Sequence, residues 1–553
     1  MAGWEFATIW ETLADGLANA PALVQGERVR SWADLDHRAD AVAAWLGSLA
    51  PAAQDRVAQY LHNSPEYLES VLATYKVGLV PVNTNYRYGV DELAYLWGNA
   101  EPVAVIVHGS FVELAEAVRP RVPSIRGWLV VDDGTSPCPS WASPYESVAS
   151  VKVPRQRAPW GRDGDQLCLL YTGGTTGLPK GVMWRQDDLV ALMPRTGPFT
   201  FEPVPDYQSL ARAIREPGQR AIAACPLMHG TALLTSQAVL SQGGSVTVLE
   251  SRRFDEYEFL DVVEARHIEA AIIVGDAFAR LILAALDASP GRWDLSSLTV
   301  IGSSGAMWSE PVKRGLLAHH SAMLLVDAYG SSEALQLGTS ISGGSSAAAT
   351  ASFALGERAV VVTDDGRTIT AGSGEVGLVA MDGRLPVGYF RDDAKTAVTF
   401  RVLGGRRYAV PGDLATIEAD GSITLLGRGS GCINTGGEKV YAEEVEEALK
   451  THPDVVDAVV VGLPDERWGE VVSALVELRA GATRPTGELV EHVKGQLAGY
   501  KAPRWLYVVE SIGRAPNGKV DYRQARATAL ALASAPFEVD ARSPVARSES
   551  TTA

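Results

Sequence analysis

LLYTGGTTGLPKGV, residues 169–182, is the stretch that decides both the architecture and the chemistry of this chain. Its first residues form an apolar run typical of a buried strand, and glycines follow at once. Glycines let the backbone curl so that N–H groups converge on an anion, threonine hydroxyls add donors, and Lys180 adds positive charge. Pro179 precedes that lysine and no Ser or Thr follows it, so this is not a Walker loop. A Gly/Thr-rich surface turn is the alternative, but the stretch favours a phosphate-binding loop. Its candidate contacts are Thr172, Gly173, Gly174, Thr175, Thr176, Gly177 and Lys180.

β-Branched runs that end in glycine or polar residues alternate with Ala- and Leu-rich helical patterns on both sides of this loop. Strands that alternate with helices predict parallel, doubly wound sheets, whose ligands bind beyond the carboxyl ends of the strands. The expected strands are 102–109, 127–134, 245–251, 270–276 and 298–305, and helical patterns cover 112–118 and 280–288.

The pattern changes twice toward the C-terminus. Residues 357–427 are rich in strands and turns, which predicts an antiparallel, β-rich subdomain. A long amphipathic helix at 442–452 and a strand at 457–463 then begin a second unit. We therefore expect an α/β fold with a large N-terminal domain, a small α+β C-terminal domain and a disordered polar tail. The ranges of these parts are 1–429, 430–535 and 536–553.

Composition excludes several classes of function. Among 553 residues, 49 Lys and Arg face 66 Asp and Glu, and the resulting charge of −17 argues against nucleic-acid binding. No apolar run is long enough to span a bilayer, so we expect a cytoplasmic protein without integral membrane contact. The four cysteines are far apart, and no metal-ligand spacing occurs among the nine histidines. The sequence does not fix the oligomeric state, and a homodimer is one state that it allows.

Several motifs, taken together, resemble those of the adenylate-forming superfamily, which includes acyl-CoA synthetases, luciferases and peptide-synthetase adenylation domains. YTGGTTGLPKGV resembles the family's phosphate loop, and other motifs follow along nearly the whole chain in the family's order. They are GSSGA (302–306), YGSSE (329–333), PGD (411–413), GRGS (427–430), INTGGEKVY (433–441) and RAPNGKVDYR (514–523). Taken singly, most of these suit ordinary turns or solvated charges, so the order and spacing carry the resemblance.

The resemblance implies that the chain uses ATP, Mg2+ and coenzyme A to convert a carboxylic acid to a thioester through an acyl-AMP. Lys519 would be the catalytic lysine, Glu333 would hold Mg2+, and Lys180 and His229 would act on the phosphates and the acyl carbonyl. Nucleotide contacts would come from Ser303, Ser304, Gly305, Ala306, Tyr329, Gly330, Ser331, Ser332, Asp413 and Arg428, and coenzyme A contacts from Gly436, Gly437 and Trp468. Because Lys519 lies in the small domain, that domain would move about a hinge at Ser430, where the family usually has Asp or Lys.

The acid would lie against His229, Gly275, Asp276, Gly302 and Gln336. A carboxylate beside an anionic substrate would repel it, so we expect Asp276 to pair with Arg280 one helical turn later. His229 and Trp468 would also suit ordinary core positions. Finer likeness to actinobacterial steroid side-chain CoA ligases implies a bulky, branched acid. 2-Arylpropionates and fatty acids stay open, because a large apolar pocket discriminates poorly between them. The alternatives are transfer of the acyl group to a carrier-protein thiol and a non-catalytic nucleotide-binding protein.

Overall fold

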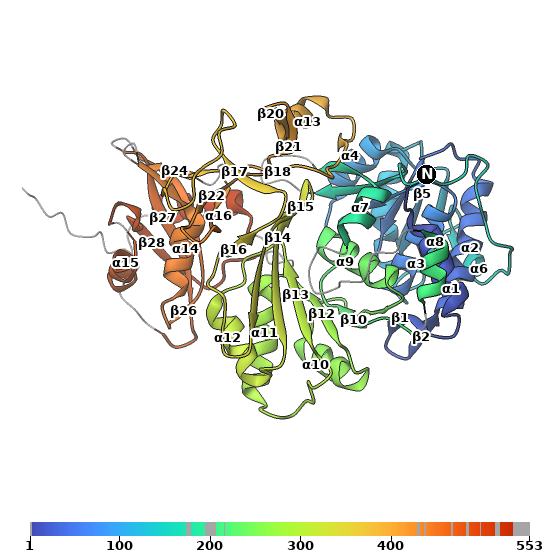
Figure 1. Ribbon diagram of the computed structural model, residues 1–553, viewed down its shortest axis with the longest axis horizontal. Coiled ribbons are helices and arrows are strands. Elements are labelled where there is room, and N and C mark those ends of the chain that lie inside the picture. The colour runs from blue at the N-terminus through green and yellow to red at the C-terminus, as the bar shows by residue number, and fades with distance from the viewer. Residues whose placement is uncertain are drawn as a thin grey trace, which may run out of the picture. The chain divides into compact units, whose positions relative to one another are not determined.

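The computed structural model describes residues 3–172, 179–193, 206–214, 216–428, 432–435, 438–465, 468–482, 486–497, 499–514 and 520–534. The chain forms two compact units (Figure 1). The first contains Met1–Ala349, Leu355–Ala359 and Ala380–Pro411, and the second contains Thr350–Ala354, Val360–Val379 and Gly412–Ala553. The expected division at residue 430 stays a prediction.

The phosphate-loop stretch lies in an eight-stranded sheet of the first unit, ordered β19-β9-β8-β4-β3-β5-β6-β7. Strands β8, β4, β3, β5, β6 and β7 run parallel, whereas β9 is antiparallel to both of its neighbours. The predicted strands at 102–109 and 127–134 are confirmed as β5 and β6. The bounds are β3 (Arg56–Tyr60), β4 (Val80–Asn83), β5 (Pro102–His108), β6 (Gly127–Val131), β7 (Ser143–Pro144), β8 (Leu167–Thr172), β9 (Lys180–Arg185) and β19 (Gly388–Tyr389).

A second run of strands in the first unit has the order β2-β1-β11-β10-β12-β13-β14-β15, parallel from β1 to β14. It contains the predicted strands at 245–251, 270–276 and 298–305, as β11, β12 and β13. The bounds are β1 (Pro21–Gln25), β2 (Arg28–Ser31), β10 (Arg220–Ala223), β11 (Ser245–Thr247), β12 (Ala270–Ile273), β13 (Val300–Ser304), β14 (Leu324–Ser331) and β15 (Ala334–Gly343). A hairpin of β20 (Phe400–Leu403) and β21 (Arg406–Ala409) follows later in the chain.

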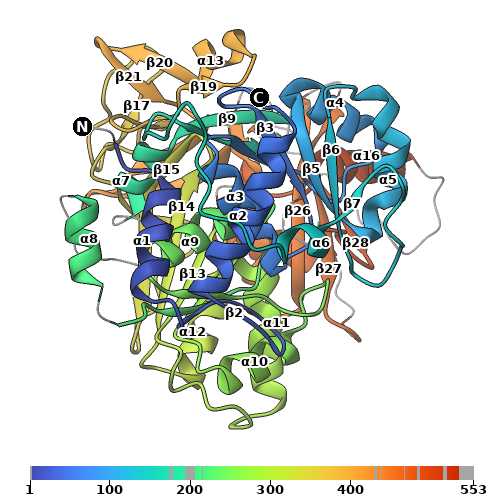
Figure 2. The same ribbon diagram turned by 90° about the vertical axis from the view of Figure 1, so that its right-hand side faces the viewer.

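Helices cover these sheets, so the expected doubly wound architecture is confirmed. Figure 2 shows α2 and α3 side by side. A capping box of Ser31 and Asp34 begins α2, and Pro65 occupies the first turn of α3. The helices are α1 (Phe6–Gly16), α2 (Trp32–Ser48), α3 (Pro65–Lys76), α4 (Val90–Ala100), α5 (Val112–Val118), α6 (Tyr145–Ala149), α7 (Gln186–Leu192), α8 (Tyr207–Ala213), α9 (Gly230–Ser241), α10 (Glu256–Ala265), α11 (Gly275–Ala288), α12 (Glu310–His319) and α13 (Asp393–Thr399). The 3-10 helices η1 (Gly109–Phe111) and η2 (Arg119–Arg121) flank α5.

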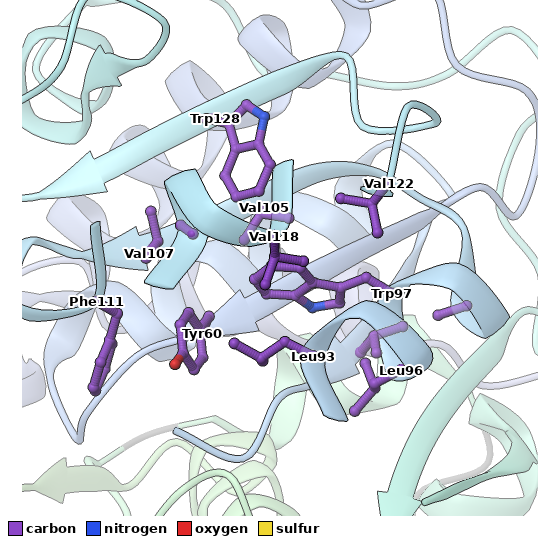
Figure 3. Packing of buried hydrophobic residues seen from close by; sticks show 14 of the residues in the cluster. Tyr60, Leu93, Leu96, Trp97, Val105, Val107, Phe111, Val118, Val122 and Trp128 are labelled. Carbon is purple, nitrogen blue, oxygen red and sulfur yellow. The ribbon is translucent and has the colours of Figure 1, made fainter. Parts of the chain in front are cut away.

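Aromatic and aliphatic side chains form the core between β3, β5 and β6 and helices α4 and α5 (Figure 3). The Trp97 ring lies edge-on to Tyr60 and to Trp128, with centroids 5.5 and 5.7 Å apart. Such edge-to-face contacts add to the free energy gained by burying the rings. This core packs α4 and α5 against the parallel strands of the eight-stranded sheet.

A buried ionic cluster joins α1, α2 and α3. Lys76 is fully buried, and its Nζ lies 2.9, 2.6 and 2.8 Å from carboxylate oxygens of Glu11, Asp36 and Asp40. Arg162 donates to Glu11 as well, at 2.8 Å. Burial opposes ionisation of Glu11, but the hydrogen bonds and charges of Arg162 and Lys76 outweigh it and lower the pKa of Glu11 to about 2.

The second unit contains part of the expected β-rich stretch and a separate five-stranded sheet, whereas β19, β20 and β21 of that stretch belong to the first unit. In the first set, β23 pairs with β16 and β22, and β22 pairs with β18, all antiparallel as expected. The five-stranded sheet has the order β25-β24-β27-β26, with β28 beside β27. The strands, some of which extend into the first unit, are β16 (Ser352–Leu355), β17 (Ala359–Val362), β18 (Gly377–Met381), β22 (Asp413–Ile417), β23 (Ser422–Arg428), β24 (Cys432–Thr435), β25 (Glu438–Tyr441), β26 (Val455–Asp465), β27 (Gly469–Leu478) and β28 (Trp505–Val509).

Alternation along β26 builds a core on each face of the five-stranded sheet. Ala458 and Val460 face one core with α14, whereas Val459 and Val461 face the other with α16. The predicted helix at 442–452 and strand at 457–463 are confirmed as α14 and part of β26. The helices of this unit are α14 (Ala442–Lys450), α15 (Thr486–Lys494), η5 (Gly499–Lys501) and α16 (Tyr522–Ser534). Among the described residues, no helix is long and apolar enough to cross a membrane.

Candidate functional site

The two strands that carry the predicted phosphate loop form an antiparallel pair. Thr172 ends β8, Lys180 begins β9, and the two residues are register partners. The chain therefore leaves the sheet at Thr172 and re-enters it at Lys180, whereas a helix would follow a Walker loop. Residues Gly173, Gly174, Thr175, Thr176 and Gly177 lie outside the described residues, so their contacts with phosphate stay predictions.

A basic, a phenolic and an acidic side chain meet beside this loop. The Lys180 Nζ lies 5.5 Å from the centroid of the Tyr389 ring, and the Tyr389 hydroxyl donates to Glu333 Oε1 at 2.7 Å. Tyr389 is on β19, where it is the register partner of Val182. Lys180, predicted to contact phosphate, thus lies over the ring of Tyr389, and Glu333, predicted to hold Mg2+, accepts from its hydroxyl.

Tyr389 is a site residue that the sequence reasoning missed. It is buried, and no motif spacing connects it with Glu333, which precedes it by 56 residues. The pair Gly388-Tyr389 in the sequence does not by itself indicate a site residue.

The turn that carries Glu333 is held in place from β9. Ser332 O accepts a hydrogen bond from Trp184 Nε1 at 2.8 Å, and the Glu333 backbone N–H donates to Ser331 Oγ at 3.3 Å. Gly330 allows a close turn, since a Cβ there would lie 2.8 Å from the Leu335 carbonyl oxygen. Tyr329, also predicted, is buried on β14 in the same segment.

The GSSGA segment lies at the carboxyl end of β13, between β12 and β14. Gly302, Ser303 and Ser304 belong to the strand, and Gly305 and Ala306 follow it. Gly305 has φ +92°, a conformation that favours glycine, and Ser304 O accepts a hydrogen bond from Thr231 Oγ1 at 3.4 Å. These predicted adenine and acyl contacts therefore end one strand of the second sheet, as the doubly wound pattern led us to expect.

Gly275 and Asp276 make hydrogen bonds to the 302–309 segment, which contains GSSGA. The Gly275 N–H donates to Ser303 Oγ at 2.8 Å, and Asp276 Oδ1 accepts from the Ser309 N–H at 2.9 Å. The expected pairing is confirmed, because Arg280 Nε donates to Asp276 Oδ2 at 3.0 Å. The carboxylate of Asp276 is therefore paired with Arg280 and bonded to the Ser309 N–H. Its predicted contact with the acid, like that of Gly275, stays a prediction.

A buried ion pair lies next to Ser303. Its cross-strand neighbour Asp327 is 3.1 Å from Lys313 Nζ, and both side chains are buried. Burial raises the pKa of Asp327 to about 6 although Lys313 opposes the shift. The pair stabilises the junction of β13, β14 and α12.

His229 and Gln336 approach the region from two further elements. His229 directly precedes α9, and its N–H donates to Pro226 O at 3.1 Å. Gln336, on β15, uses its Nε2 to donate to Leu192 O at the end of α7, at 2.9 Å. Their predicted contacts with the acid stay predictions.

The predicted ribose contacts are neighbours on paired strands of the second unit. Asp413 begins β22, is buried, and is the register partner of Arg428, which ends β23. Gly427 beside Arg428 has φ +98°, a backbone conformation that favours glycine. The Arg428 side chain is outside what the structure describes.

Of the predicted coenzyme A contacts, Trp468 is described. Its ring is half-buried and lies beneath the guanidinium of Arg504, 4.5 Å from the centroid. The backbone N–H of Trp468 donates to Asp465 Oδ1 at 2.9 Å. Gly436, Gly437, the hinge residue Ser430 and the catalytic candidate Lys519 lie outside the described residues.

Thiol chemistry by the protein itself is unfavourable at the described cysteines near the site. Cys168 and Cys225 are buried, and burial raises the pKa of their thiols to about 11 and about 12. Neither is a thiolate near neutral pH, so neither is suited to act as a nucleophile.

Comparison with known proteins agrees with this geometry. A family model described as "AMP-binding enzyme" matches residues 10–387, and a second, "AMP-binding enzyme C-terminal domain", matches residues 444–519. The chain is 39% identical over 529 residues to a medium/long-chain-fatty-acid–CoA/3-oxocholest-4-en-26-oate–CoA ligase of Mycolicibacterium smegmatis, covering 94% of this chain and 95% of the relative. It is also 39% identical, over 535 residues and with the same coverage, to a 3-oxocholest-4-en-26-oate–CoA ligase of Rhodococcus rhodochrous.

A solved structure shows the same fold. The crystal structure of the anthranilate CoA ligase AuaEII in complex with anthranoyl-AMP has a TM-score of 0.83 to this chain. The two are 22% identical, and the likeness covers 97% of this chain and 99% of the other.

Proposed function

The chain belongs to the AMP-binding enzymes as an AMP-forming acid–thiol ligase, and we propose that it activates a bulky hydrophobic carboxylic acid. The acids that the relatives' names give, medium- and long-chain fatty acids and 3-oxocholest-4-en-26-oate, are the substrates we place first. The observation that carries the adenylation chemistry is the cluster of Lys180, Tyr389 and Glu333 beside the loop between β8 and β9.

Adenylation joins two anions, so the site must neutralise charge before they react. A carboxylate oxygen attacks the α-phosphorus of ATP, an acyl–O–P bond forms, and the bond to pyrophosphate breaks. Lys180, at the start of β9, would place its ammonium group beside the phosphates together with the N–H groups of the loop. His229 would lie on the carbonyl side of the acid, directly before α9.

In the second half-reaction the thiolate of coenzyme A attacks the acyl carbonyl. The thioester bond forms, the acyl–O bond breaks, and AMP leaves with the electron pair. Gly436, Gly437 and Trp468 are the proposed coenzyme A contacts.

Glu333, the acidic residue of the cluster, is suited to bind a metal ion that arrives with the nucleotide. No group of three or more His, Cys, Asp or Glu side chains able to hold a metal occurs among the described residues. Nucleotide-bound Mg2+ needs only one or two carboxylates, because phosphates and water complete its shell. The half-buried Glu333 meets that requirement, with the Tyr389 hydroxyl fixing one of its oxygens. When bound there, Mg2+ would neutralise phosphate charge.

The second unit would supply the remaining nucleotide contacts. Asp413 and Arg428, as register partners, are suited to hold the two ribose hydroxyls from neighbouring strands. Lys519 would stabilise the charge that develops at the α-phosphate, and Ser430 is the proposed hinge.

An acid panel tests this function. Acyl-CoA formation with ATP, Mg2+ and coenzyme A would be measured by mass spectrometry for a steroid side-chain acid, a 2-arylpropionate, a medium-chain and a long-chain fatty acid, and benzoate. We expect thioester from the steroid acid or the fatty acids and little from benzoate. Glu333→Gln should lower the rate, whereas Glu375→Gln, at an exposed pair with Arg367, should leave it unchanged.

Two other outcomes would contradict the proposal. Acyl-AMP that accumulates without thioester would mean that a carrier protein, not coenzyme A, is the acceptor. ATP binding without acid-dependent release of pyrophosphate would mean that the chain is a nucleotide binder.

A further inference from the structure

One buried asparagine side chain bonds to two segments of the site. Asn83 ends β4, and its Oδ1 accepts from the Tyr171 N–H at 2.7 Å. Its Nδ2 donates to Tyr171 O at 2.9 Å and to Met228 O at 2.6 Å. The side chain is 5% exposed, so these three hydrogen bonds use its acceptor and both of its donors without competition from bulk water.

Each bonded residue directly precedes a proposed site residue. Tyr171 is followed by Thr172, where the chain leaves β8 for the phosphate loop, and Met228 is followed by His229. The first segment belongs to the eight-stranded sheet, and the second follows β10 of the other sheet. Asn83 thus spans the two sheets of the first unit at the place where phosphates and acid would meet.

A second asparagine fixes the same loop from the preceding strand. Asn63, shortly after β3, donates through Nδ2 to Cys225 O at 2.9 Å and accepts at Oδ1 from the Leu227 N–H at 2.7 Å. The backbone of 225–228 is therefore held at three points by side chains from the eight-stranded sheet. Of these two asparagines, Asn83 also bonds to β8, the strand that leads to the phosphate loop.

We propose that Asn83 is a positioning residue that sets the distance between the end of β8 at Thr172 and His229, and so aligns the acid carboxylate with the α-phosphate. This inference rests on the proposed adenylation function. Alignment matters most while the acid and ATP are separate molecules. Once acyl-AMP has formed, a covalent bond fixes the two parts relative to each other.

The test separates the two half-reactions. In Asn83→Ala and Asn83→Asp we expect acid-dependent pyrophosphate release to fall roughly tenfold to a hundredfold in kcat/KM, as for a displacement of about 1 Å. Thioester formation from supplied acyl-AMP should stay near the wild-type rate. The aspartate variant keeps the side-chain volume and removes the two donors, so a result shared by both variants cannot come from a cavity. Equal loss in both half-reactions would overturn the proposal.

Asn99→Ala is the matched control, because Asn99 accepts from the Tyr171 hydroxyl and has no described bond to the 225–229 loop. It should leave adenylation close to wild type, and a loss equal to that of Asn83→Ala would contradict the proposal.

Hydrogen–deuterium exchange gives a readout without activity. In Asn83→Asp, peptides covering 169–172 and 225–230 should both lose protection, while those from β5 and β6 should not. If the protection of these peptides is unchanged in Asn83→Asp, the proposed role of Asn83 is wrong, even if none of the acids in the panel is a substrate. Inactivity of the wild-type chain with all acids would count against the proposed function alone.

Discussion

Replacing Tyr389 with phenylalanine removes the hydroxyl that donates to Glu333. The ring stays, so the contact with the Lys180 ammonium group is kept, but Glu333 Oε1 loses a donor at 2.7 Å. A hydrogen bond to a charged group contributes about 1.5–3 kcal/mol, which corresponds to roughly 10-fold to 150-fold in rate. Because Glu333 is only half-buried, water can replace the hydroxyl, and we expect a loss near the lower limit.

The assay is acid-dependent pyrophosphate release at saturating acid, measured as kcat/KM for ATP over a range of Mg2+ concentrations. If the Tyr389 hydroxyl orients Glu333 toward the metal, the loss should be greatest at low Mg2+ and smaller at high Mg2+. Tyr408→Phe is the control, since Tyr408 lies on β21 and none of the described hydrogen bonds involves its hydroxyl. A Tyr389→Phe enzyme with unchanged kcat/KM at low Mg2+ would refute the reasoning, as would an equal loss in the control.

Three further predictions concern the catalytic lysine and the buried ionic cluster. Lys519→Ala should abolish acyl-AMP formation while thioester formation from supplied acyl-AMP continues, and equal loss of both would contradict the assignment. Lys76→Met leaves three carboxylates without their shared cation and should destabilise the first unit by about 3–5 kcal/mol. The free energy of unfolding would be measured in urea by tryptophan fluorescence. Lys494→Met, which removes an exposed ion pair with Glu491, is the control and should change that free energy little. The pKa of Glu11 is lowered to about 2 from 4.5. The contribution of Glu11 to the free energy of unfolding is therefore complete above pH 4.5 and is lost as the pH falls toward 2. Glu11→Gln should flatten this part of the stability profile, and an unchanged slope would count against the cluster.

What the sequence predicted well depends on local patterns. The strands β5, β6, β11, β12 and β13 follow from runs of β-branched residues, and the Asp276–Arg280 pair follows from helical spacing. Lys180 and Glu333 were predicted as site residues because each belongs to a contiguous motif, and in the structure both contact Tyr389. Gly427 likewise lies within a motif, although the sequence does not reveal its positive φ of +98°.

What the sequence missed depends on pairing between distant segments. Tyr389 reaches the site because β19 pairs with β9, about two hundred residues earlier, and such pairing leaves no local signal. Asn83 has the appearance of an ordinary turn residue after a strand, since asparagine is common there. Its three bonds become visible only when the two sheets are in place. The antiparallel return of β9 was not predicted either, because the glycine loop alone does not fix where the chain goes next.

The pairing of β19 with β9 also has a consequence for synthesis on the ribosome. Until residues 388 and 389 have left the exit tunnel, the outer edge of β9 has no strand beside it, although β8 and β9 can already pair. An unpaired strand edge is a template for association with other chains. The nascent protein therefore carries an open edge during roughly two hundred residues of elongation, and the same late strand that closes this edge delivers Tyr389 to Glu333. Protection from aggregation and completion of the site thus occur in one folding step.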